Sequence, residues 1–122
     1  MAVTHSSTIR DGLCNYVVDA IDAAGPGTLE FLTSGDIECA TLTFSATAFG
    51  AASSGVATAS AITSDTSATG GTVAKFVVKS GTPAEIFYGA VSTSGSDINL
   101  SSLAVGAGDT VSISSLTYTA PA

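Results

Sequence analysis

The chain has 122 residues, a length typical of one domain, and its ten Asp and Glu against three Lys and Arg give a formal net charge of −7. Because Lys and Arg are so few, the protein has little electrostatic attraction to nucleic-acid phosphates or to an anionic membrane surface. We therefore expect neither nucleic acid nor a membrane as a partner. Ala, Gly, Ser and Thr make up 68 residues and Trp is absent, which predicts a thin core. We therefore expect contacts with other copies or another protein to contribute to stability.

The sequence also predicts a protein that is made in the cytoplasm. No run approaches the roughly 20 apolar residues that span a membrane, and the first residues lack the basic and apolar regions of a secretory signal. Cys14 and Cys39 fit no zinc-binding spacing. In a reducing compartment we expect both to be free thiols that pack as small apolar side chains.

Residues 8–24 predict an amphipathic helix. Apolar side chains at three- and four-residue spacing should form its core-facing stripe: Ile9, Leu13, Tyr16, Val17, Ala20 and Ile21. The opposite face should meet water and carries Arg10, Asn15, Asp19 and Asp22. Ser6, Ser7 or Thr8 can cap the start, and the segment Gly25-Pro26-Gly27 should end the helix.

After Gly27 the apolar pattern has period two, which is typical of strands. Thr28–Thr33 and Ile37–Phe44 should pair across the turn-forming triplet Ser34-Gly35-Asp36. Val56–Ile62 predicts a further strand, in which the alanines at 57, 59 and 61 would let another layer approach closely.

The second half of the chain predicts a hairpin and two more strands. Ser64–Gly71 is a polar loop, and Thr72–Lys79 should form an antiparallel hairpin with Ala84–Val91. Asp97–Leu100 predicts a short strand and Asp109–Thr119 the last one.

The last predicted strand contains a change of phase. Val111 and Ile113 share one parity, whereas Leu116 and Tyr118 have the other. One extra residue at Ser114-Ser115 would place all four on the same face, so we expect a β-bulge there.

Together these elements predict a mainly β fold in one domain over residues 1–122. We expect an antiparallel β-sandwich, or a jelly-roll-like or partly open barrel, of about seven strands with one N-terminal amphipathic helix.

The residues that could take part in catalysis or bind a metal do not indicate an enzyme. His5 is the only histidine and lies in an expected N-terminal tail, where a general base is hard to hold in place. Asp36 and Glu38 share strand parity, and Asp65 and Asp97 lie in loops, but nothing matches a calcium loop, so we expect these carboxylates to cap turns. We therefore predict no catalytic, cofactor-binding or metal-binding residues, and no cofactor.

The stretch Phe49–Leu100 resembles a group of small tailed-phage virion proteins. The similar segments are Ala48–Ile62 (AFGAASSGVATASAI), Ser64–Thr72 (SDTSATGGT), Val91–Leu100 (VSTSGSDINL) and Val111–Ser114 (VSIS). The resemblance implies a capsid decoration (cement) protein, which assembles in the host cytoplasm and resides in the virion. Its implied partners are the major capsid protein or other virion proteins, with the chain itself a dimer or trimer.

Two alternatives differ from this interpretation. The protein could serve in the phage neck or tail as a structural or adaptor protein. It could instead bind a host-surface glycan or receptor, although the aromatic candidates Phe87, Tyr88 and Tyr118 are expected in the core. For a particle-building protein, we expect Met1–Thr8 or the Ala-rich Ala46–Ala61 region to contact the partner.

Overall fold

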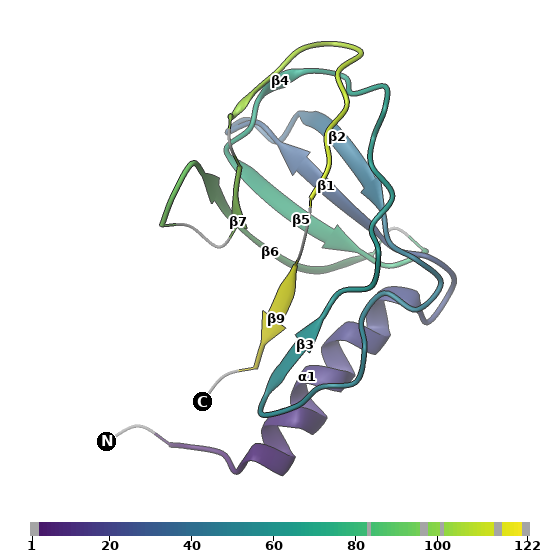
Figure 1. The fold of residues 1–122 in the computed structure, drawn as a ribbon, viewed down its shortest axis with the longest axis vertical. Coiled ribbons are helices and arrows are strands. Elements are labelled where there is room, and N and C mark those ends of the chain that lie inside the picture. The colour runs from purple at the N-terminus through teal and green to yellow at the C-terminus, as the bar shows by residue number, and fades with distance from the viewer. Residues whose placement is uncertain (1–2, 83, 96–97, 101, 114–115, 121–122) are drawn as a thin grey trace.

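The computed structural model describes residues 3–82, 84–95, 98–100, 102–113 and 116–120. Within these residues the protein is mainly β, with one N-terminal helix and a curled, mixed sheet of five strands that forms a half-barrel (Figure 1). The predicted class, a mainly β protein of the partly open barrel type with an N-terminal helix, is confirmed.

Helix α1 spans Ser7–Asp22 and begins at one of the predicted caps. Ser6 has extended backbone, and its hydroxyl accepts a hydrogen bond from the backbone N–H of Ile9 at 3.4 Å. Beyond the helix the chain turns at Gly25, whose φ of 107° favours glycine. The predicted helix start and the glycine-rich turn after it are therefore both present.

The half-barrel has the strand order β2-β1-β5-β6-β7. Its strands are β1 (Thr28–Leu32), β2 (Glu38–Thr43), β5 (Lys75–Lys79), β6 (Glu85–Ser92) and β7 (Ile98–Asn99). The predicted β1–β2 pair and the β5–β6 hairpin are both present and antiparallel. Strand β7 joins β6 in parallel, which makes the sheet mixed rather than wholly antiparallel.

Two short antiparallel pairs accompany the half-barrel: β3 (Val56–Thr58) with β9 (Thr117–Thr119), and β4 (Gly71–Thr72) with β8 (Ala104–Val105). Strand β3 is shorter than the predicted Val56–Ile62, because the chain beyond it bonds to two different neighbours. The N–H of Ala59 donates to the carbonyl of Leu116 at 2.8 Å, and that of Ser60 to the carbonyl of Ala48 at 2.9 Å.

The C-terminal segment does not form the single strand Asp109–Thr119 that alternation predicts. Val111 forms an isolated bridge with Asp65, whereas β9 pairs with β3, so the segment changes partners along its length. Val111 and Leu116 are both buried despite their opposite parity. The bulge predicted at Ser114-Ser115 lies outside the described residues.

The core joins the inward side of the half-barrel to α1 and the β3–β9 pair. Its largest fully buried side chains include Phe31, Phe44, Ile21, Leu29 and Leu42. Ala57 is wholly buried in β3, where its small side chain lets α1 pack closely. Of the other two alanines predicted on that side, Ala59 is half-buried and Ala61 is exposed.

Candidate interaction surface

The residues considered for catalysis and metal binding do not form one site, although the structure brings Glu38 and Asp65 together at Thr41. His5 lies in the exposed stretch before α1, and Asp97 lies outside the described residues. Among the residues that the structure describes, no group of three His, Cys, Asp or Glu side chains could hold a metal ion. None of the described helical residues forms a segment long and apolar enough to cross a membrane.

Two of the carboxylates fasten the polar loop after residue 63 to β2. Asp65 accepts hydrogen bonds from the backbone N–H of Thr41 at 2.8 Å and from that of Ser67 at 2.9 Å. Glu38 accepts from the hydroxyls of Thr41 and Thr69, both at 2.7 Å. The bonds of Asp65 match its expected role in capping backbone groups, whereas Glu38 lies in β2 and accepts from side-chain hydroxyls instead of capping a turn.

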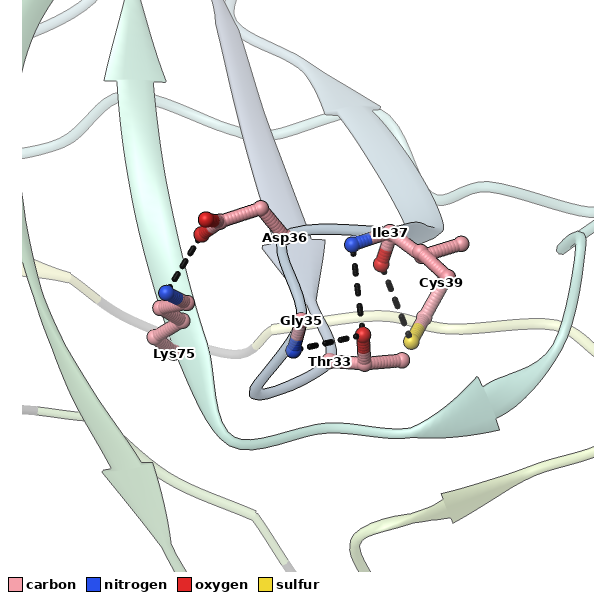
Figure 2. A network of polar contacts seen from close by, with 6 residues as sticks. All are labelled: Thr33, Gly35, Asp36, Ile37, Cys39 and Lys75. Atoms are coloured by element: carbon pink, nitrogen blue, oxygen red, sulfur yellow. Dashed lines mark hydrogen bonds and ion pairs between the residues drawn. The ribbon is translucent and has the colours of Figure 1, made fainter.

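The turn between β1 and β2 uses its polar groups in the same way (Figure 2). The Thr33 hydroxyl accepts from the backbone N–H groups of Gly35 and Ile37, both at 3.2 Å. Asp36, with a left-handed φ of 66°, forms an ion pair with Lys75 on β5. Asp36 therefore stabilises the turn and its contact with the neighbouring strand.

Both cysteines are free and buried, as predicted. The Cys14 thiol donates to the carbonyl of Tyr118 at 3.4 Å. The Cys39 thiol donates to the carbonyl of Ile37 at 3.8 Å, as Figure 2 shows. Burial, the main cause, raises the pKa of both thiols above the ordinary value. The neutral thiols are therefore poor nucleophiles and act as packing groups.

Helix α1 is rotated about its axis relative to the predicted orientation. Its buried residues are Cys14, Val18 and Ile21. Three members of the predicted core stripe are instead exposed, with exposed fractions of 52% for Ile9, 41% for Leu13 and 81% for Tyr16. The predicted inward face was therefore wrong for all of its large side chains except Ile21 and Val17, which are buried and half-buried.

The physical reason lies in the loop that packs against the helix, residues 48–55. This loop is irregular and consists mostly of Ala, Ser and Gly, so few of its own side chains can accept bonds from its backbone N–H groups. Polar side chains of α1 supply the acceptors: Asp22 to Ala48 at 2.8 Å, Asn15 to Ala52 at 2.9 Å and Asp11 to Gly55 at 2.6 Å. Of the residues predicted to meet water, Asn15 and Asp22 are thus bound to the loop backbone, whereas Asp19 is exposed as predicted.

Arg10 extends this inward polar contact to the C-terminal segment. Its guanidinium donates to the carbonyl of Ala120 at 3.2 Å. It also lies against Gly55, where an added Cβ would come within 2.7 Å of the Arg10 Cζ. Gly55 has a φ of 78°, so glycine there serves both the turn and the close approach of Arg10.

We call Ile9, Leu13, Tyr16 and Ala20 the outer face of α1. These residues lie within one narrow sector at 100° per residue, away from the buried Cys14, Val18 and Ile21. The outer face contains no charged residue, and the exposed Asp19 lies at its edge. Ile9, Leu13 and Tyr16 are exposed and Ala20 is half-buried. An apolar helical stripe that is largely exposed is typical of a protein-interaction surface.

A second exposed region lies on the outward side of the half-barrel. A groove of about 670 Å³ is lined there by residues of four strands, among them Glu30, Lys79, Glu85 and Tyr88. Lys79 pairs with Glu30 at 3.1 Å across β5 and β1. Tyr88 is 72% exposed, so its predicted place in the core was wrong.

The other two aromatic candidates are half-buried against each other. The rings of Phe87 and Tyr118 have centroids 5.1 Å apart, and both pack against the core. A second hollow, of about 690 Å³, lies along the C-terminal segment, and Asp109 is its one charged residue among those described.

The fold and this surface define a half-barrel β protein whose helix is held by polar contacts inside and presents an apolar face outside. The chain matches no protein-family model, and neither curated proteins nor solved structures give a significant match. The resemblance of Phe49–Leu100 to tailed-phage proteins therefore remains a prediction.

Proposed function

We propose that this protein is a non-enzymatic structural subunit of a phage particle, acting as a capsid decoration protein. The observation that carries the proposal is the orientation of α1. Three of its polar residues bind the loop backbone inside the molecule, whereas Ile9, Leu13 and Tyr16 are directed outward without a covering layer among the described residues. An assembly in which another protein subunit covers this face removes that apolar surface from water.

The composition supports the same proposal. Asp, Glu, Lys and Arg make up 11% of the residues, so the surface consists largely of hydroxyl, backbone and small apolar groups that can enter a permanent protein contact at little desolvation cost. The phage setting rests on the sequence resemblance. The major capsid protein is the proposed main partner, and a position in the neck or tail is the variant of this proposal.

The test is recovery of the protein from virions of the phage that encodes it. We expect gradient-purified particles to contain the protein in stoichiometric amounts by quantitative mass spectrometry. Its absence from mature particles would refute the proposal.

A matched pair of variants tests the surface. Tyr16→Glu should reduce incorporation at least about tenfold, because it places a charge in the contact, whereas Tyr88→Glu should incorporate normally. Both side chains are highly exposed, so neither change should unfold the protein. Point variants are preferable to deleting residues 1–8, because that deletion removes the Ser6 cap of α1.

A second candidate function, binding of a host-surface glycan, is favoured by one observation. Tyr88 is exposed beside a groove lined by Glu30, Glu85 and Lys79, and an exposed aromatic ring next to polar groups can stack on a sugar. A glycan array with the wild-type protein and Tyr88→Ala would test it. Equal signals from both proteins would exclude this site.

A further inference from the structure

We infer that the subunit covering the outer face of α1 is a second copy of this chain, packed antiparallel to the first about a two-fold axis. This inference rests on the proposed function only in that both require the outer face to be covered by protein. It adds the identity of the partner, the orientation of the two helices and the residues in register.

The spacing of the outer face is symmetric along the helix. The intervals between its residues are four, three and four, for Ile9, Leu13, Tyr16 and Ala20. The order of these intervals is therefore the same from either end of the helix. Intervals of three and four are those of a helix–helix seam. In a two-fold pair of antiparallel helices, Ile9 then lies opposite Ala20 of the second copy, and Leu13 opposite Tyr16 of the second copy.

The sizes of the facing residues are complementary in this register. The large side chain of Ile9 meets the small one of Ala20. At the flank of the seam Gly12 lies opposite Val17 of the second copy, and an added Cβ at Gly12 would meet nothing within 4 Å in the single chain. A parallel pair would instead place Tyr16 against Tyr16 and Ala20 against Ala20, which leaves one layer crowded and the other empty.

The charge distribution permits the pair and sets its salt dependence. The outer face contains no charged residue, so no buried ion has to lose its hydration on association. Each copy has a formal net charge of −7, so the two copies repel each other over distances that salt screens. Added salt should therefore strengthen the association.

The size of the seam sets the expected strength. With Tyr16 alone presenting about 200 Å² of surface, the two copies together bury on the order of 1,000 Å², near the lower limit of a specific interface. Helices of 16 residues, such as α1, are about 24 Å long, which suffices for this contact. We expect a dimer with a micromolar dissociation constant that separates on dilution.

Sedimentation velocity of the full chain tests the pairing. Wild-type protein should change from monomer to dimer between about 1 µM and about 500 µM, and Tyr16→Glu should weaken the dimer at least about tenfold. Tyr88→Glu is the matched control and should dimerise as the wild type does. A wild-type monomer throughout this range, or equal dimerisation of Tyr16→Glu, would overturn the inference.

Cross-linking tests the antiparallel register. A mixture of Ile9→Cys and Ala20→Cys proteins should be joined by a short bis-maleimide, because these positions face each other. Either variant alone should remain uncross-linked, because in the antiparallel pair its two new thiols lie about 16 Å apart along the seam. Efficient cross-linking of each variant to itself would indicate a parallel pair and refute the register.

The two proposals fail separately. A monomeric chain that still enters particles through α1 would refute self-pairing and leave the proposed function standing. A dimer with the predicted cross-links that no virion contains would do the reverse.

Discussion

Gly27 lies where the turn after α1 crosses the end of β5, and its lack of a side chain is a packing requirement. An added Cβ would collide with the carbonyl oxygen of Lys79 and would lie 2.5 Å from the Cγ2 of Ile21. Gly27→Ala should lower the free energy of unfolding by about 1–3 kcal/mol through overpacking. Urea unfolding measures this change.

Gly35 provides the control for that substitution. Its nearest atom to an added Cβ is the Thr33 Oγ1 at 3.8 Å, an ordinary contact. Gly35→Ala should change the unfolding free energy by no more than about 0.5 kcal/mol. Equal losses in the two variants would contradict the packing account of Gly27.

The two buried thiols predict a loss of stability at alkaline pH. Burial raises the pKa of Cys14 and of Cys39 above the ordinary value of 9.0, so the folded protein keeps protons that the unfolded chain releases. The stabilisation is complete below the ordinary thiol pKa and is lost as the pH rises through the folded values. The unfolding free energy should therefore fall more steeply from about pH 8 to about pH 10 in the wild type than in Cys14→Ala/Cys39→Ala. Parallel curves for the two proteins would contradict this.

At the scale of the element, α1 shows what the sequence could and could not predict. Its existence and its Ser6 cap followed from spacing and capping chemistry. Its orientation did not, because the helix has a second short apolar stripe, Cys14, Val18 and Ile21, beside the longer one. The choice between them was made by the loop at residues 48–55, whose backbone needs acceptors, and this need appears only when the chain is folded.

The polar contacts of α1 should matter more for stability than exposed charges do. Asp22→Ala leaves the backbone N–H of the buried Ala48 without its acceptor and should lower the unfolding free energy by about 1–3 kcal/mol. Asp19→Ala, in the same helix but exposed, should change it by less than about 0.5 kcal/mol. Denaturant unfolding of both variants provides the comparison, and similar losses would argue against the inward role of the polar face.

The strands were predictable where alternation and turn residues agreed. The β1–β2 pair and the β5–β6 hairpin follow from period-two patterns around short turns. The segments after Thr58 and before Thr117 could not be predicted, because their backbones divide their bonds among several partners. Strand β8 has only two residues, which is too short for an alternating pattern to indicate it.

At the scale of the whole molecule, the described residues include two exposed surfaces of different chemistry, the outward side of the half-barrel and the outer face of α1. The outward side of the half-barrel is charged and carries ion pairs between Lys and Asp or Glu. The outer face of α1 is apolar and uncharged. Because the two surfaces differ in chemistry, a single partner contact should protect one and leave the other accessible.

Tyr16 and Tyr88 make that difference measurable, being 81% and 72% exposed in the single chain. Hydroxyl-radical footprinting read by mass spectrometry should show strong protection of Tyr16 in the assembled state and unchanged labelling of Tyr88. Equal labelling of Tyr16 in the free and assembled protein would contradict the central claim that the outer face of α1 is a protein contact.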